Sequence, residues 1–279
     1  MGTPWFDKVL IDLSKMIISE EEIGLDENPD IFFIGFSAMD YIIHNYGPFS
    51  QEAMDYFIRL DIQLDELFKH IDNEIGLENV EFILTSDHGG LPLPEYLPRL
   101  NLSGGRINRE NLNEAFSWID DEISEQFDKN LYYRDWSNFY FFHEKLKKKE
   151  FLPEDLEKII KKYLMMVDGV KNVITKKEIL SSNETDNISL RLKNMIHVKK
   201  SADVFVLLEP GYLYRNPHGT SHGSPYDYDA HVPLLFAKKE RDRKVISSHT
   251  ETVDIAPTIL NLLNIKLNNS FDGKALPIR

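Results

Sequence analysis

The chain has 279 residues, no cysteine and a formal net charge of −14. A chain of this length forms one large α/β domain or two small ones. Without cysteine it has no disulfide, no thiolate metal site and no cysteine nucleophile, and its excess of acidic residues argues against a nucleic-acid-binding surface.

The first 90 residues alternate between helical and strand-like patterns. Apolar residues at helical spacing predict a helix over residues 5–20 and a long amphipathic helix from the cap at Ser50 to Asp72. The short apolar runs at 31–36 and 80–85 are typical of buried strands. Polar residues follow both runs closely, so we expect them near strand ends.

The rest of the chain continues this alternation after a long excursion. We expect residues from about 91 to 200 to form a mostly helical insertion or cap within a single domain spanning 1–279. Strands alternating with long helices predict an α/β fold with a largely parallel sheet flanked by helices. The elements predicted in this part are helices at 109–126, 139–149 and 153–167, strands at 203–208 and 232–236, and a helix at 252–263.

Three short segments carry residues suited to a metal site. The residues are Asp40 and His44 in F-S-A-M-D-Y-I-I-H, Asp87 and His88 in L-T-S-D-H-G-G, and His222 in G-T-S-H-G-S-P. Carboxylate and imidazole groups are the ligands that hold zinc and its neighbours. In open α/β sheets, ligands collect beyond the carboxyl ends of strands. Together the segments favour a metal site.

Each of the first two segments also has an ordinary structural interpretation. Asp40 and His44 are four residues apart, so a helix places both on one face, where surface pairs of this kind are common. Asp87 and His88 are adjacent and point in different directions, which fits a loop around one ion or a simple turn.

The third segment is ambiguous in the same way. His222 lies in a glycine-rich loop, where it could bind a metal or bond to the backbone. His218 and His231 are rival candidates that we expect to be structural. A polar core without metal is the remaining interpretation, and it is disfavoured because several ionisable groups would then be buried without partners.

At these residues the chain resembles the alkaline phosphatase superfamily. Within it, the resemblance is to the branch of phosphate-irrepressible alkaline phosphatases related to type I phosphodiesterases and nucleotide pyrophosphatases. Sulfatases, phosphonate hydrolases and cofactor-independent phosphoglycerate mutases share the metal pattern but fit residues 219–233 less well. The resemblance runs from Thr3 to the C-terminus and rests on Thr3-Pro4, Glu20 to Gly24, the segment around Asp40, Arg59 to Asp61, T-S-D-H-G, and residues 204–212, 219–233 and 253–258.

The resemblance implies an alkaline-phosphatase-like fold that holds two divalent metal ions, expected to be Zn²⁺. Asp40, His44 and His222 would complete one metal site. Asp87 and His88 would form part of the other, which lacks an Asp in this chain. In such enzymes a Thr or Ser nucleophile attacks phosphorus while the two ions activate it and stabilise the leaving oxygen.

We identify no catalytic nucleophile in these residues. The resemblance implies that the nucleophile, the remaining Asp and the groups that bind the phosphoryl oxygens come from an N-terminal half of the fold. We therefore expect residues 1–279 to form a single incomplete domain, the C-terminal portion of such an enzyme. Such a domain would expose a sheet edge and apolar surface, and a complementary N-terminal fragment is one candidate partner.

The predicted function is that of a metal-dependent phosphate-ester hydrolase, a phosphomonoesterase or phosphodiesterase, which is inactive as this chain alone. Its substrate in the intact enzyme would be a phosphorylated small molecule. The alternative is a non-catalytic, truncated homologue that binds metal. No run of residues approaches the ~20 apolar residues of a membrane helix. The resemblance implies a periplasmic or secreted location, although the start of the chain lacks the pattern of a signal peptide, so the compartment stays open.

Overall fold

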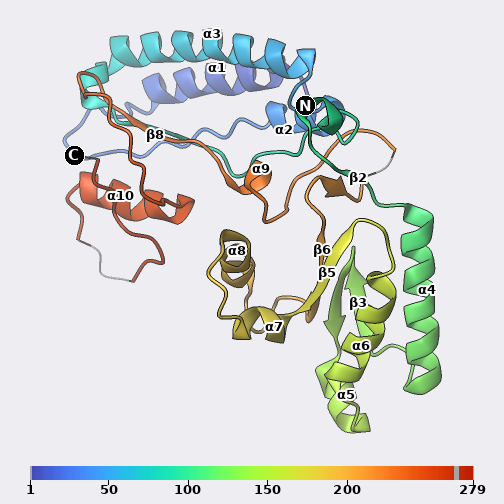
Figure 1. Cartoon of the computed structure of the whole chain (residues 1–279). Helices are drawn as coiled ribbons and strands as arrows, with labels where there is room; N and C mark the ends of the chain where they lie inside the picture. Colours follow the sequence, from blue (N-terminus) through green and yellow to red (C-terminus); the bar gives the residue numbers. More distant parts are fainter. Residues whose placement is uncertain (1, 216, 267–269, 279) are drawn as a thin grey trace. The chain divides into compact units, whose positions relative to one another are not determined.

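A computed structural model describes residues 2–215, 217–266 and 270–278 (Figure 1). Its elements group into two compact units. Unit 1 comprises Met1–Ile42, Ser50–His88 and Val232–Arg279, and unit 2 comprises Ile43–Phe49 and Gly89–His231. None of the helices in the described ranges is long and apolar enough to cross a membrane.

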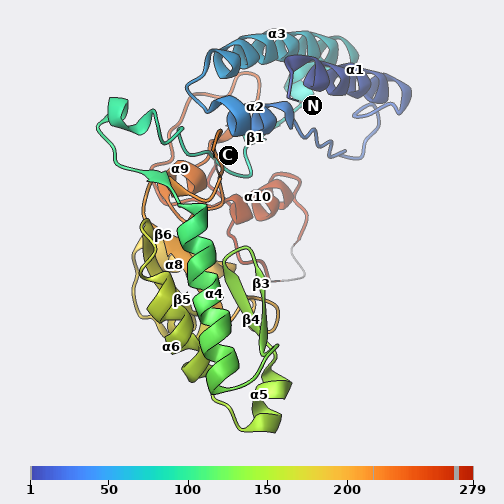
Figure 2. The same ribbon diagram turned by 90° about the vertical axis from the view of Figure 1, so that its right-hand side faces the viewer.

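Unit 1 is organised around two packed helices. α1 (Pro4–Glu20) and α3 (Gln51–Glu74) lie side by side in both views (Figures 1 and 2). The side chain of Ser50 caps α3 by accepting a hydrogen bond from the Ala53 N–H at 3.1 Å, which satisfies one of the N–H groups that a helix start leaves without a partner. The core between the two helices contains Ile11, Ile18, Leu67 and Ile71.

The remaining elements of unit 1 include a short antiparallel strand pair. β1 (Phe82–Thr85) pairs with β8 (Leu234–Ala237), with Phe82 opposite Ala237 and Thr85 opposite Leu234. The helix α2 (Ala38–Tyr46) begins in unit 1 and ends in unit 2. The other elements of unit 1 are the 3₁₀ turns η1 (Leu77–Asn79) and η3 (Thr252–Asp254) and the helix α10 (Ile255–Leu262).

Unit 2 contains an antiparallel four-stranded sheet, whose strands are, in order, β3 (Tyr132–Asp135), β4 (Asn138–Phe141), β6 (Val204–Leu208) and β5 (Val170–Thr175). Its core joins residues of β4 and β6 to the helices α4 (Arg109–Gln126) and α6 (Pro153–Leu164), and Phe139, Leu156 and Val204 are all fully buried there. The elements of unit 2 are η2 (Leu97–Leu100), β2 (Gly105–Arg106), α4 (Arg109–Gln126), β3 (Tyr132–Asp135), β4 (Asn138–Phe141), α5 (His143–Lys149), α6 (Pro153–Leu164), β5 (Val170–Thr175), α7 (Lys176–Ser181), α8 (Asn187–Met195), β6 (Val204–Leu208), β7 (Tyr212–Leu213) and α9 (Asp227–Ala230).

The α/β class predicted from the sequence is confirmed, and most predicted elements form. α1, α3, α4, α6 and α10 match predicted helices, and β1, β6 and β8 match predicted strands to within a few residues. The region from about 91 to 200 lies within unit 2 and contains the helices α4 to α8 as well as the strands β2 to β5. The single incomplete domain spanning 1–279 stays a prediction.

The strands differ from the sequence-based expectation in their direction. Among the described residues, β2 and β7 form a parallel pair, whereas β1–β8 and the sheet of unit 2 are antiparallel. The expected largely parallel sheet is therefore not what these strands form. Alternation of strands and helices in sequence predicts parallel crossovers, but β3 and β4 follow one another through a tight turn, which joins antiparallel strands.

Two predicted elements are wrong in detail. The apolar run at 31–36 is not a strand, because no strand in the described part of the chain pairs with it, and Phe33 is 80% exposed. The helix predicted at 139–149 begins only at His143. The preceding residues form β4, where Phe139 and Phe141 are buried in alternation with less buried neighbours, which is the period of a strand.

Candidate metal centre

The helix α2 is anchored at its start by a buried carboxylate from α1. Asp7 is fully buried, and its two oxygens accept hydrogen bonds from the N–H groups of Ser37 at 3.3 Å and Ala38 at 3.2 Å. The Tyr56 hydroxyl donates to the same carboxylate at 2.6 Å. A negative group at a helix N-terminus satisfies its N–H groups and interacts favourably with the helix dipole. Asp7 therefore fixes the first turn of α2, which carries Asp40.

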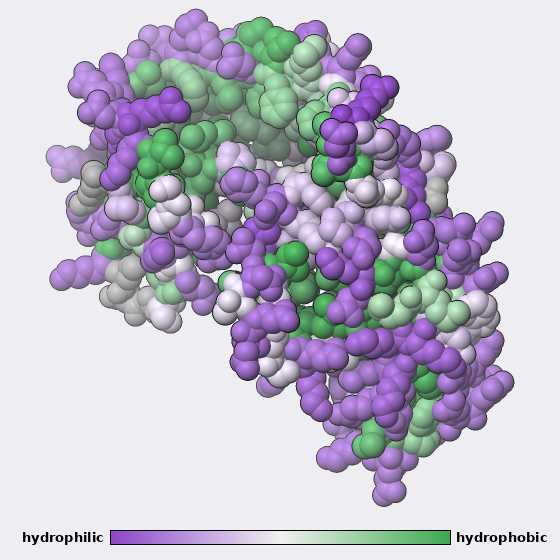
Figure 3. All heavy atoms as spheres, viewed as in Figure 1, coloured by the Kyte–Doolittle hydropathy of each residue, from purple (hydrophilic) through white to green (hydrophobic). Residues whose placement is uncertain are grey.

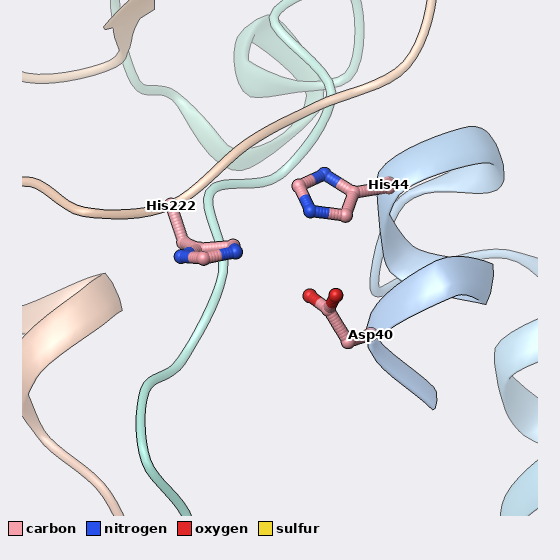
Figure 4. A group of neighbouring side chains, drawn as sticks. All are labelled: Asp40, His44 and His222. Atoms are coloured by element: carbon pink, nitrogen blue, oxygen red, sulfur yellow. The ribbon is translucent and has the colours of Figure 1, made fainter. Parts of the chain in front are cut away.

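Three of the residues expected to bind a metal lie together. Asp40 and His44 project from successive turns of α2, and His222 reaches the same point from the loop before α9 (Figure 4). One potential ligand atom from each of the three lies within 4.8 Å of the others. The rings of His44 and His222 have centroids 5.0 Å apart and are tilted by 40°.

The orientation of the His44 ring follows from its contact with Thr220. The ring Nδ1 lies 2.9 Å from the Thr220 carbonyl oxygen. A carbonyl can only accept, so Nδ1 carries the proton and the ring lone pair is on Nε2. A metal-binding histidine is oriented in this way when its other nitrogen donates to a carbonyl.

The loop that brings His222 to α2 is held by close backbone contacts. The Thr220 N–H donates to the His44 carbonyl at 3.0 Å, and the buried Thr220 hydroxyl donates to the Leu91 carbonyl at 2.7 Å. Gly219 has φ +80°, and a Cβ at this position would lie 2.1 Å from the His44 carbonyl oxygen. Only glycine fits there.

Asp87 and His88 follow β1 after one intervening residue, Ser86. His88 Nε2 lies 3.5 Å from Asp87 Oδ2 and 4.0 Å from Asp40 Oδ1. The side chain of His88 is 25% exposed, whereas that of Asp87 is 86% exposed. The structure therefore places His88 next to Asp40, but neither Asp87 nor His88 belongs to the group of three.

The two rival histidines and a neighbouring serine do not add to the site. His218 and His231 are exposed, and neither belongs to a cluster of metal-binding side chains within the described ranges. The hydroxyl of Ser86, which precedes Asp87, donates to the His88 carbonyl at 2.7 Å. This bond occupies the proton that a nucleophilic hydroxyl would have to release.

The donor set fits a divalent transition metal. One carboxylate and two imidazoles are the three protein ligands of many catalytic zinc sites, which keep a fourth position for water or substrate. Zinc holds its nitrogen and oxygen ligands at about 2.0–2.2 Å, so the ligand atoms must lie close together. The three atoms of this group lie within 4.8 Å of one another, which is near the compactness that one shared ion requires.

Sequence reasoning missed the residues that hold these three side chains in place. Asp7 lies in a helical pattern that reveals nothing of its partner 30 residues away. Thr220 belongs to the segment that predicted His222, but its partner His44 lies 176 residues earlier. Apolar residues that mark the helical period of α1, such as Val9 and Met16, are exposed in the structure, so this period gives no signal for the buried Asp7.

The chain is similar to known proteins along nearly its whole length. Residues 3–231 match the family described as type I phosphodiesterase / nucleotide pyrophosphatase. Alkaline phosphatase PhoV from Synechococcus elongatus is 28% identical over 98% of this chain and 49% of its own length. Alkaline phosphatase PafA from Elizabethkingia meningoseptica is 25% identical over 98% of this chain and 50% of its own length.

A solved structure extends this similarity to the fold. The crystal structure of wild-type alkaline phosphatase PafA matches with a TM-score of 0.86 at 24% identity, covering 99% of this chain and 52% of that chain. The predicted alkaline-phosphatase-like fold is thereby confirmed. The chain spans about half the length of the curated relatives that it matches.

Proposed function

The chain belongs to the type I phosphodiesterase / nucleotide pyrophosphatase family of the alkaline phosphatase superfamily. On this basis we propose that it takes part in the hydrolysis of phosphate esters, at a site built on Asp40, His44 and His222. The family and the relatives indicate a phosphoester hydrolase of the alkaline phosphatase or phosphodiesterase type. The observation that carries the proposal is the convergence of these three side chains within 4.8 Å.

We propose Zn²⁺ as the metal, because one carboxylate and two imidazoles suit it. A bound zinc ion would supply positive charge that lowers the pKa of a hydroxyl or water and stabilises negative charge on oxygen. Asp87 and His88 would contribute to a second ion. We propose that a further carboxylate for that ion comes from a complementary polypeptide.

The chain's own residues prepare the site in three ways. Asp7 fixes the start of α2, so Asp40 and His44 are presented from a rigid element. Thr220 holds the His44 ring in the tautomer that exposes Nε2 to a metal. The net charge of −14 does not prevent binding of a phosphorylated substrate, because divalent cations reverse the local sign.

For these 279 residues alone we propose metal binding without turnover. No hydroxyl in the described part of the site has the setting of an activated nucleophile, and Ser86 and Thr220 both donate to backbone carbonyls. A complementary polypeptide would then supply the nucleophile. A non-catalytic metal-binding homologue is the second candidate function, and the same observation favours it.

The apolar surface of unit 1 supports a complementary polypeptide as partner. On α1, Trp5, Val9 and Met16 lie on one face and are 63–67% exposed. A second stripe on α3 contains Met54, Phe57, Ile58 and Ile62, which are 54–61% exposed. Figure 3 shows apolar side chains at the surface of this part of the molecule. Contiguous apolar patches of this kind mark interaction surfaces.

The test measures zinc content together with hydrolysis of p-nitrophenyl phosphate at alkaline pH. We expect about one zinc ion per chain and no turnover. The variants Asp40→Ala and His222→Ala should lose the zinc, whereas His218→Ala should keep it. Turnover by the wild-type chain that both ligand variants abolish would show that these residues contain a nucleophile. A wild-type chain without zinc would reject the metal site itself.

A further inference from the structure

Asp229 is a buried carboxylate close in sequence to His222. It lies in α9 and is 4% exposed. Its Oδ2 accepts hydrogen bonds from the Ser224 N–H at 2.8 Å and the Ser224 hydroxyl at 2.6 Å. Its Oδ1 is buried and has no hydrogen-bond partner among the described residues. Burying a carboxylate is costly, so its place here calls for a role.

The two bonds from Ser224 restrain the loop that carries His222. Ser224 is two residues after His222, and Gly223 between them has φ +103° with open space around it. Glycine leaves the backbone free to adopt many conformations. The bonds to Asp229 remove this freedom at the next residue, and so limit the positions that the His222 ring can reach.

The backbone of Asp229 also holds the chain next to His88. Its carbonyl accepts a hydrogen bond from the Gly89 N–H at 2.7 Å. A Cβ on Gly89 would lie 2.2 Å from the carbonyl oxygen of Tyr228, so the two segments are in direct contact. Asp229 thus fixes the residue that follows His88 as well as the loop that follows His222.

The segment around Asp229 is itself anchored. Tyr226 is 7% exposed, and its hydroxyl donates to the Leu208 carbonyl at the end of β6 at 2.6 Å. The Asp229 N–H donates to the Tyr226 carbonyl at 3.0 Å. The position of the Asp229 carboxylate is therefore fixed. Its hydrogen bonds to Ser224 restrain the loop that carries His222, because α9 itself is anchored.

We propose that Asp229 is a positioning residue for metal binding, which orients His222 through Ser224 and the chain after His88 through its own carbonyl. It binds no metal itself, and it does not belong to the group formed by Asp40, His44 and His222. This inference rests on the proposed function in so far as His222 is a metal ligand. It adds a residue beyond the five that the sequence indicated.

The first test compares zinc affinity, measured by calorimetric titration, between matched variants. Asp229→Ala removes the acceptor and should weaken zinc binding roughly 10- to 100-fold, as is typical when a group that orients a ligand is lost. Asp229→Asn keeps an acceptor oxygen for Ser224 and should stay within about threefold of wild type. Asp203→Ala is the control, because Asp203 is also buried in unit 2 and accepts from the Phe141 N–H at 2.8 Å, but anchors no predicted ligand.

The outcomes separate positioning from other roles. Equal weakening in Asp229→Asn and Asp229→Ala would assign the effect to charge and overturn the proposal. If Asp203→Ala weakened zinc binding by the same factor, the effect of Asp229→Ala would reflect a general loss of stability. That result would also overturn the proposal. Ser224→Ala removes the 2.6 Å bond to Asp229 and a weaker 3.4 Å bond from the Tyr226 N–H, but keeps the bond from the Ser224 N–H to Asp229. It should weaken binding in the same direction but less, which provides a test if Asp229→Ala does not fold.

A readout without metal keeps this inference separate from the proposed function. Nuclear magnetic resonance of chains with labelled histidine rings reports the setting of His222, assigned through the variant His222→Gln. In metal-free Asp229→Ala the His222 signals should shift or broaden, while those of the exposed His197 stay in place. Unchanged His222 signals would overturn the proposal. Suppose that the wild-type chain bound no zinc, but the His222 signals changed in Asp229→Ala. The positioning role of Asp229 would then be supported, and the proposed metal site would be rejected.

Discussion

His44 and Thr220 exchange two hydrogen bonds. The His44 Nδ1–H donates to the Thr220 carbonyl at 2.9 Å, and the Thr220 N–H donates to the His44 carbonyl at 3.0 Å. One bond sets the direction of the imidazole, and the other fixes the backbone that carries it. Such a reciprocal pair defines both the position and the tautomer of the His44 ring.

The Thr220 hydroxyl should contribute to stability through its buried bond to Leu91. Thr220→Val keeps the shape but removes the donor to the Leu91 carbonyl, whose residue is 3% exposed. We expect the free energy of unfolding to fall by about 1–3 kcal/mol, the cost of leaving a buried acceptor without a partner. Urea unfolding measures this, and Thr220→Ser, which retains the hydroxyl, should lose less. Equal losses in both variants would contradict the role of the hydroxyl.

Alanine variants at two glycines of the same loop should distinguish the cost of a steric clash from the cost of backbone strain. Gly219 and Gly223 both have positive φ, but a Cβ would contact the His44 carbonyl at 2.1 Å only at Gly219, and nothing within 4 Å at Gly223. Gly223→Ala should therefore cost about 1–2 kcal/mol for the left-handed backbone. Gly219→Ala should cost more and also abolish zinc binding, which calorimetry and metal analysis report. Retained zinc in Gly219→Ala would argue against the close approach.

Two carboxylates should differ in their effect on metal content. Asp40 belongs to the group of three, whereas Asp87 is 86% exposed and is not a member of that group. Asp40→Ala should remove the tightly bound zinc ion. Asp87→Ala should leave it bound and weaken only a second, looser ion, which a titration with excess Zn²⁺ detects. The prediction is wrong if the Asp87 variant loses the first ion as completely as the Asp40 variant.

Alkaline pH should destabilise the chain through Tyr56. Burial, together with the hydrogen bond to Asp7, raises the pKa of the Tyr56 phenol in the folded state above its ordinary value of about 10. The neutral phenol therefore stabilises the fold fully below pH ~10. As pH rises further, the unfolded state releases this proton first, and the free energy of unfolding falls.

The measurement is the free energy of unfolding in urea between pH 8 and 11.5. Above pH ~10 the wild-type curve should fall more steeply than that of Tyr56→Phe, by up to about 1.4 kcal/mol per pH unit for one proton. Other buried tyrosines titrate in both proteins and cancel in the comparison. Parallel curves would exclude Tyr56 as the source.

The apolar stripes on α1 and α3 should cause self-association. Trp5 and Val9 are 67% and 65% exposed, and water disfavours such surface. We expect the wild-type chain to form oligomers at micromolar concentration in analytical ultracentrifugation. Replacing Val9 and Met16 by Lys should shift it towards the monomer, whereas the same change at the exposed polar residues Glu52 and Asp55 should not. A compact wild-type monomer would contradict the expected need for a partner.

Much of the helical structure could be predicted because its cause is local. The period of apolar residues marks α1, α3, α4 and α6 without any knowledge of distant partners. The run at 31–36 has the composition of a strand, but a strand exists only where a neighbour accepts its backbone bonds. In β4, buried residues alternate with less buried ones directly before the helical residues of α5. The predicted helix therefore began too early, because these few residues were included in its pattern.

The three side chains that meet at the candidate site could be anticipated from the sequence, whereas the residues that support them could not. Asp40, His44 and His222 stand in segments with a chemical signature. Asp7, Gly219 and Asp229 act through contacts to residues far away in sequence or to backbone atoms. Neither kind of contact leaves a pattern in the composition or spacing of the sequence. The same limit applies to Thr220, whose hydroxyl bonds to a carbonyl 129 residues earlier.

The separation of 176 residues between His44 and Thr220 has a consequence for biosynthesis. At about 5–20 residues per second, a ribosome needs roughly 9–35 s to make the intervening chain. The segment with Asp40 and His44 is therefore made well before the loop that orients the imidazole. If the group of three binds a metal as proposed, an ion can join the complete group only after the loop carrying His222 has also been made.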